Sequence, residues 1–153
     1  MTNFSQRGGG WVLGQSVLIL AVAALALRFR SDRRLLALTI AGVALLILAA
    51  VVGCAGVLGL GRGLTPFPKP SANARLVQRG VYGWMRHPLY TSVMAAALGW
   101  VLVWQSWPAL LAALGLIAFF DAKARREERW LREQFPEYPE YAKRVRRFVP
   151  GVY

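Results

Sequence analysis

The residues best suited to chemistry form one short motif, Arg86-His87-Pro88-Leu89-Tyr90, which contains the only histidine of the chain. A histidine can bind a ligand or transfer a proton near neutral pH. Pro88 suits the first turn of a helix because it has no N–H to leave unpaired, so the motif stands where a loop ends and a helix begins. A lone histidine at a helix start is more often a capping or packing residue, so the motif gains weight only from its surroundings.

A second group of ionisable residues follows the last apolar run. Residues 121–135 are predicted to continue that run as a helix, with Lys123 and Glu127 one turn apart on one face. Glu128 and Arg132 have the same spacing. The simplest interpretation is a solvated helix with exposed ion pairs of little energetic value. Carboxylates and a histidine could equally form one polar site if the fold brings them together.

Composition indicates the class of protein that must position these groups. Hydrophobic residues make up 56% of the 153 residues, mean hydropathy is +0.40 and the formal net charge is +12. Apolar blocks joined by basic connectors are typical of a small polytopic membrane protein, whereas a soluble nucleic-acid binder would not carry such long apolar runs. The single cysteine, Cys54, lies inside an apolar block and allows no intramolecular disulfide.

Four apolar runs predict an all-α protein with four transmembrane helices. They cover about 11–27, 35–60, 89–104 and 107–120. The last two are short and separated by two residues, so they predict a helical hairpin, with tryptophans at its tip as in an interfacial aromatic belt. We expect residues 1–153 to form one membrane domain that keeps its N-terminal segment, in which the connector 61–88 and the tail 121–153 form the catalytic region.

The basic residues predict the orientation of these spans. With four spans, the N-terminus, the connector and the tail share one side and hold 15 of the 19 Lys and Arg residues. The positive-inside rule places that side in the cytoplasm, of the inner or cell membrane. The remaining four arginines crowd into the loop 28–34, which taken alone also looks cytoplasmic. In either orientation the connector and the tail lie on the same side of the membrane, and this makes a shared site possible.

The ordered motifs resemble a known family, the integral-membrane methyltransferases that include isoprenylcysteine carboxyl methyltransferase and the phospholipid N-methyltransferases. The resemblance covers about the C-terminal 90 residues. It rests on Thr65-Pro66-Phe67-Pro68-Lys69-Pro70, Leu76-Val77, Gly80-Val81-Tyr82, Arg86-His87-Pro88-Leu89-Tyr90, Glu127-Glu128, Leu131, Phe135, Tyr138, Tyr141 and the stretch from Val145 to Pro150.

The resemblance implies S-adenosylmethionine as the methyl donor, bound where the connector and the helix after the hairpin converge. It implies cofactor-binding roles for Ala74, Arg75, Leu76, Val77, Tyr82, His87, Pro88, Leu89, Tyr90 and Glu127. Lys123 matches a substrate-facing position that holds arginine in enzymes acting on prenylcysteine. We expect catalytic roles for Arg86, His87 and Tyr90. The sequence departs from the family pattern at Lys123, Ser92 and Pro136, and lysine cannot grip a carboxylate with the two-pronged geometry of arginine.

These residue types suit the chemistry. S-adenosylmethionine carries an ammonium, a carboxylate, a sulfonium and an adenine, for which Glu127, His87 with Arg86, and the rings of Tyr82 and Tyr90 provide partners. Methyl transfer is a single displacement that requires no metal and no covalent nucleophile, so positioning and water exclusion can supply much of the acceleration. A carboxylate acceptor needs no base, whereas an amine or thiol must lose a proton, which His87 or a glutamate could take.

The acceptor remains open at this stage. We expect a lipophilic acceptor that reaches the site from the bilayer, either an isoprenylcysteine-like carboxylate or a lipid. A phospholipid amine or a small thiol is the alternative. No nucleic acid and no obligate protein partner are expected. A non-catalytic membrane regulator or scaffold is the competing class, whereas an ion-coupled transporter is disfavoured because the four predicted spans contain no Asp, Glu, Lys, Arg or His.

Overall fold

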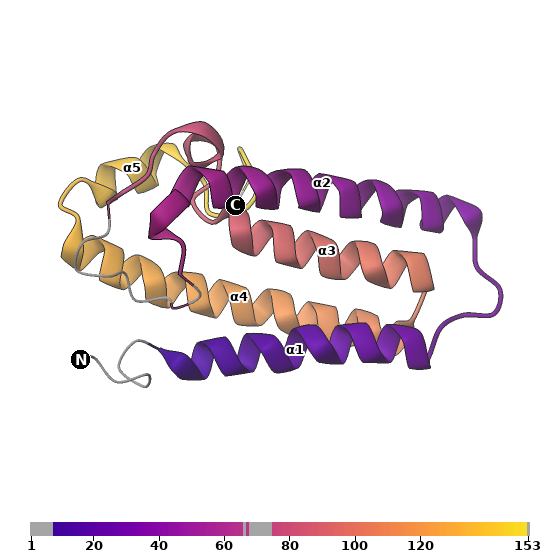
Figure 1. Cartoon of the computed structure of the whole chain (residues 1–153). Coiled ribbons are helices and arrows are strands. Elements are labelled where there is room, and N and C mark those ends of the chain that lie inside the picture. Colours follow the sequence, from indigo (N-terminus) through magenta and orange to yellow (C-terminus); the bar gives the residue numbers. More distant parts are fainter. Residues whose placement is uncertain (1–7, 66, 68–74, 153) are drawn as a thin grey trace.

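The computed structural model describes residues 8–65, 67 and 75–152. Over these ranges the chain is helical and has no strand, so the predicted all-α class is confirmed. Figure 1 shows the elements in chain order. They are α1 (Gly9–Arg28), α2 (Leu36–Leu60), the 3-10 turns η1 (Gly61–Gly63) and η2 (Gly80–Gly83), α3 (Pro88–Trp104), α4 (Trp107–Gln134) and α5 (Tyr138–Arg144).

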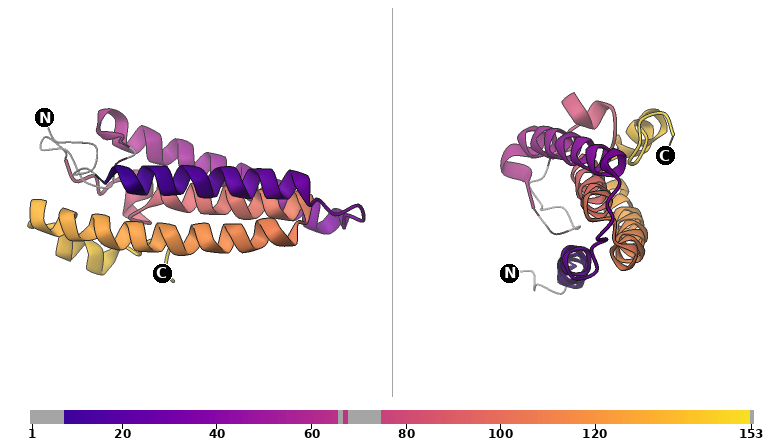
Figure 2. Two further views of the ribbon diagram at one scale, coloured as in Figure 1. Left: turned by 90° about the horizontal axis from the view of Figure 1, so that it is seen from below. Right: turned by 90° about the vertical axis from the view of Figure 1, so that its right-hand side faces the viewer.

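The helices are arranged around the hairpin of α3 and α4. α2 packs along α3, and α1 packs mainly along α4, so the first two helices lie on different sides of the hairpin (Figures 1 and 2). At one end of the bundle the Gln105 side chain bonds the backbone N–H and carbonyl of Leu35, at 3.0 and 2.9 Å. These contacts join the α1–α2 loop to the hairpin turn. η2 and α5 lie at the opposite end, as expected for a connector and a tail that share one side.

Among the described residues, three helices are long and apolar enough to cross a membrane, namely α1, α2 and α4. α3 is also apolar but has only 17 residues, which at 1.5 Å per residue span roughly 26 Å against a hydrocarbon core of about 30 Å. The predicted count of four spans therefore stays a prediction. α4 continues without interruption from its apolar part, 107–120, into the charged part, 121–134, as the sequence predicted.

Glycines allow α2 and α3 to pack at close range. A Cβ atom on Gly42 would lie 2.7 Å from the Gly99 carbonyl oxygen, and one on Gly99 would lie 2.8 Å from that of Gly42. Farther along, Ser92 of α3 faces Gly53 of α2, where an added Cβ would lie 2.6 Å from the serine Oγ. Small residues of this kind let helix backbones approach within a membrane, where van der Waals packing is the main attraction.

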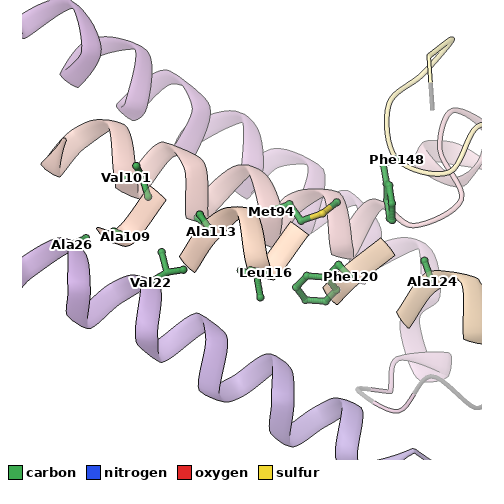
Figure 3. Close-up of a cluster of buried hydrophobic side chains, with 11 residues drawn as sticks. Val22, Ala26, Met94, Val101, Ala109, Ala113, Leu116, Phe120, Ala124 and Phe148 are labelled. Atoms are coloured by element: carbon green, nitrogen blue, oxygen red, sulfur yellow. The ribbon is translucent and has the colours of Figure 1, made fainter. Parts of the chain in front are cut away.

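The other face of α3 and the inner face of α4 bury a core against α1. Its members are small or apolar: Val22, Ala26, Met94, Ala97, Val101, Ala109, Ala113, Leu116, Phe120, Ala124 and Phe148 (Figure 3). Phe148 comes from the tail, which therefore folds back onto the hairpin. This core fixes the end of α3 that carries the histidine motif against the charged part of α4.

Candidate functional site

The histidine motif is held in place by the tail. His87 is the residue that precedes α3, and Pro88 occupies the first turn, as predicted. The backbone N–H groups of Arg86 and His87 donate to the carbonyls of Arg146 and Arg147, at 2.9 and 3.0 Å. This short parallel pairing places the tail beside the motif, although 59 or more residues separate them in the sequence.

Glu128 of α4 is the centre of the polar cluster. Its carboxylate is only 1% exposed and pairs with Arg86 Nη2 at 2.9 Å, Arg147 Nε at 3.0 Å and His87 Nε2 at 3.2 Å. Burial alone would raise the pKa of this carboxyl, but hydrogen bonds from His87 and Arg147 and the charge of Arg86 hold it well below its usual range. The interpretation of a solvated helix is therefore wrong for this residue, which stays ionised among cations.

His87 lies between the two glutamates. Its Nε2 faces Glu128, whereas its Nδ1 is 4.0 Å from Glu127 Oε2. The imidazole ring stacks on Tyr90, with centroids 5.2 Å apart and planes at 6°. A ring nitrogen beside a carboxylate carries the proton, so we assign the hydrogen to Nε2. Nδ1 is then directed toward Glu127 and is the nitrogen positioned to take or hold another proton.

Glu127 belongs to a separate group with Tyr90 and Lys123. The Tyr90 hydroxyl donates to Glu127 Oε2 at 2.5 Å. Burial raises the pKa of the Glu127 carboxyl, while His87, the tyrosine hydroxyl and Lys123 oppose that rise. The Lys123 ammonium lies 5.0 Å from the Tyr90 ring centroid and donates to Gln15 Oε1 of α1. This group stands where the apolar part of α4 ends.

Tyr82 and Tyr141 connect the connector to α2 and α5. The Tyr82 hydroxyl donates to the Gly56 carbonyl at 3.3 Å, and the Tyr141 hydroxyl donates to the Tyr82 carbonyl at 2.6 Å. Burial raises the pKa of Tyr141 to about 12 and that of Tyr82 further, so both stay protonated donors. Gly59 is adjacent, since a Cβ there would lie 3.0 Å from the Tyr82 ring. Tyr82 thus anchors η2 against the end of α2.

The structure brings four of the twelve predicted site residues together and places the other described ones elsewhere. His87, Tyr90, Glu127 and Lys123 form one cluster. Pro88 and Leu89 pack instead against Gly56 of α2. Leu76 packs on the apolar cluster of α5, whereas Val77 is half-buried and Arg75 is exposed. Ala74 lies outside the described residues.

Arg86 has a different position from the one its predicted catalytic role suggests. Its guanidinium is 10% exposed and bonds Glu128 through Nε and Nη2. Its Nη1 donates to the carbonyls of Ala142 and Val145, at 2.7 and 2.8 Å. These contacts tie the tail to α4, so they make Arg86 a positioning residue and do not support a role at the reacting atoms.

Sequence reasoning missed the partners of three residues at this site. It paired Glu128 only with Arg132, and it did not single out Arg147 or Gln15. The pairing of Glu128 with Arg132 one turn later was visible in the sequence. No local pattern indicates the contact of Lys123 with Gln15, because 108 residues separate the two.

Comparisons with known proteins identify the family of this chain. Residues 37–138 match the phospholipid methyltransferase family, and the chain belongs to this family. Protein-S-isoprenylcysteine O-methyltransferase B of Arabidopsis thaliana is 31% identical over 115 residues, which cover 72% of this chain and 58% of that protein. The resemblance inferred from the motifs is therefore confirmed.

Relatives with a different name also match. The cobalt-zinc-cadmium resistance protein CzcN of Cupriavidus metallidurans is 37% identical over 81 residues, and the nickel-cobalt-cadmium resistance protein NccN of Alcaligenes xylosoxydans is 33% identical over 81 residues. Each of these matches covers 52% of this chain and 38% of the relative. The chain thus aligns with between 38% and 58% of the length of these three relatives. α1 and residues 139–153 lie outside the family match.

Proposed function

We propose that this protein is an S-adenosylmethionine-dependent methyltransferase that acts at the membrane on a lipophilic acceptor. The observation that carries the proposal is the cluster of His87, Tyr90, Glu127 and Lys123 at the charged end of an apolar helix bundle. Polar groups of both signs and an aromatic face meet there, next to helices that a lipophilic molecule can reach through the bilayer.

The residues of this cluster fit the donor. S-adenosylmethionine would supply an activated methyl group on a positively charged sulfur. Glu127 is 23% exposed, and its Oε1 accepts no hydrogen bond from the residues that the structure describes, so it is available to an ammonium. The stacked rings of His87 and Tyr90 lie beside this carboxylate, and an aromatic ring suits a cation or an adenine. Glu128 is a poorer partner because its own cations already surround it.

The chain's own residues supply orientation and a proton acceptor. Tyr90 orients Glu127 through its hydroxyl, and Glu128 orients His87 through Nε2, as outer hydrogen bonds commonly do. His87 Nδ1 could accept a proton from an amine or thiol acceptor, whereas a carboxylate acceptor would need no base. Lys123 is the proposed acceptor-side residue, with Gln15 fixing its position. An isoprenylcysteine-like carboxylate or a lipid is the proposed acceptor, with a phospholipid amine or a small thiol as the alternative.

Donor binding is the decisive test. We expect Glu127→Gln to weaken S-adenosylmethionine binding to the detergent-purified protein about ten- to a hundredfold in calorimetry, because one charge-assisted contact worth about 1.5–3 kcal/mol is lost. Glu133→Gln, at an exposed position of the same helix, is the matched control and should bind as the wild type does. Equal affinity of the two variants would show that the acid is misplaced. No binding to the wild type would favour a non-catalytic scaffold.

Kinetics then separate donor binding from proton transfer. If His87 only holds the donor, His87→Ala should raise the apparent KM for S-adenosylmethionine, and saturating donor should restore the rate. If His87 also takes a proton, kcat should stay low at saturation with an altered pH profile. Mass spectrometry of lipid extracts incubated with methyl-labelled donor identifies the acceptor.

The proposed site faces the cytoplasm, because 15 of 19 basic residues belong to its side in a four-span arrangement. Single cysteines at Lys143 and Arg33, in a Cys54→Ala background, test this. The structure places the two positions at opposite ends of the bundle, so an impermeant thiol reagent applied from the cytoplasmic side should label only position 143. Labelling of position 33 from the cytoplasmic side would show that the protein has the opposite orientation.

A further inference from the structure

A basic hollow lies between the charged part of α4, α5 and the tail. It has a volume of about 560 Å³, and Pro139, Ala142 and Val152 form part of its wall. Six cationic side chains line it: Arg86, Arg125, Arg132, Lys143, Arg146 and Arg147. We refer to this feature as the basic hollow.

The basic hollow opens on a different face of α4 from the proposed methyltransferase site. Successive residues of an α-helix are rotated by about 100°. Arg125 and Arg132 therefore project on the same side as Glu128, whereas Lys123 and Glu127 project away from it. Glu128 separates the two sites, because it contacts His87 on one side and Arg147 on the other.

The charges around the hollow are unbalanced. Three carboxylates pair with its cations: Asp121 with Arg125 and Arg147, Glu128 with Arg86, Arg132 and Arg147, and Glu140 with Lys143. Within the described residues, six cations against three carboxylates leave three positive charges. Arg146 makes no ion pair within the described residues, and Arg132 remains 49% exposed although it pairs with Glu128. The lining thus retains donors that an anion can reach.

The position of the hollow along α4 suits a lipid headgroup. The apolar part of α4 ends at Phe120. Arg125 and Arg132 are 5 and 12 residues farther along the helix, or about 8 and 18 Å at 1.5 Å per residue. Headgroup layers extend about 5–8 Å beyond each side of the hydrocarbon core. The near edge of the basic hollow therefore lies at headgroup depth.

We propose that the basic hollow binds the phosphate of an anionic phospholipid headgroup. Arginine guanidinium groups pair with phosphate oxygens through two parallel hydrogen bonds, and a partly enclosed cationic site strengthens such contacts. The site is separate from the proposed methyl transfer, because its ligand lies on the far side of Glu128 from His87 and Lys123. A phosphate group bound in the basic hollow would link α5 and the tail to α4.

Binding of three soluble probes to the detergent-purified protein tests the proposal: dihexanoyl phosphatidylglycerol, dihexanoyl phosphatidylcholine and inorganic phosphate. The test variant is Lys143→Gln/Arg146→Gln. The matched control is Arg30→Gln/Arg33→Gln, which removes the same charge from exposed positions at the opposite end of the bundle. We expect phosphatidylglycerol to bind the wild type and the control alike and the test variant about tenfold or more weakly. Its affinity should also fall with added salt.

The three probes distinguish a phosphate group of a lipid from a free phosphate ion. Weaker binding of phosphatidylcholine than of phosphatidylglycerol, with weak inorganic phosphate binding, supports a lipid headgroup with net negative charge. Inorganic phosphate that binds as tightly as the lipid, and is lost in the test variant, overturns the lipid assignment in favour of a free phosphate ligand. Equal affinities of phosphatidylglycerol for the test and control variants overturn the site altogether. Circular dichroism of both variants confirms that each remains folded.

Discussion

Replacement of Glu128 by glutamine should remove the interaction that holds the histidine motif, α4 and the tail together. The substitution keeps the size of the side chain but removes its charge. Arg86 and Arg147 are then left 10% and 14% exposed without the carboxylate that both contact. The new amide N–H₂ group also points at N–H donors of the cations, in the place of a carboxylate oxygen that accepted their hydrogen bonds. The variant therefore leaves buried cations partly uncompensated.

The magnitude follows from the geometry. Removing one partner of a buried ion pair typically costs about 3–5 kcal/mol, because the remaining charge stays desolvated. Arg132 adds little, since it is half exposed and its ion pair with Glu128 is 3.6 Å long, and exposed pairs of this kind are worth about 0–1 kcal/mol. We expect a loss of about 3–5 kcal/mol in the free energy of unfolding for Glu128→Gln.

Unfolding in mixed detergent micelles measures this loss, with Glu133→Gln as the exposed control. The tail should also become sensitive to trypsin at Arg144, Arg146 and Arg147 in the variant. The lowered pKa adds a second signature: the stabilisation by Glu128 is fully present above the ordinary carboxyl pKa of 4.5 and is lost as the pH falls below it toward the folded value. Equal stability of the two variants would refute the reasoning.

Two further pairs of substitutions test the packing that supports the site. Gly99→Ala should destabilise the protein by about 1–3 kcal/mol, because its Cβ would lie 2.8 Å from the Gly42 carbonyl oxygen. Gly115→Ala, with open space around it, should be neutral or stabilise by up to about 1 kcal/mol. Equal free energies of unfolding for the two variants would contradict the close approach of α2 and α3. Tyr141→Phe should lower the free energy of unfolding by about 0.5–1.5 kcal/mol, because the hydrogen bond to the Tyr82 carbonyl is lost. Tyr138→Phe should leave it unchanged, since its buried hydroxyl has no hydrogen-bond partner within the described residues. A larger loss of stability for Tyr138→Phe than for Tyr141→Phe would argue against this network.

The sequence alone determined the helices and the family. In a membrane, an uncharged run must satisfy its backbone hydrogen bonds internally, and a helix does so. The predicted runs 11–27, 35–60 and 89–104 agree with α1, α2 and α3 within two residues at each end, and the run 107–120 begins with α4, which continues to Gln134. Pro88 likewise determined where α3 starts, because proline has no backbone N–H and suits the first turn of a helix. The family resemblance also followed from ordered local motifs, which are properties of the chain and need no knowledge of its packing.

Only the tertiary structure decided which of two adjacent acids meets which partner. Glu127 and Glu128 are neighbours in sequence, but a helix directs them about 100° apart, so one faces Tyr90 and the other faces Arg86 and Arg147. Their opposite pKa shifts follow from that difference. The contacts of Glu128 with the tail and of Lys123 with α1 join segments that no local pattern relates, because pairing across the chain depends on how the helices pack rather than on the spacing of residues within any one helix.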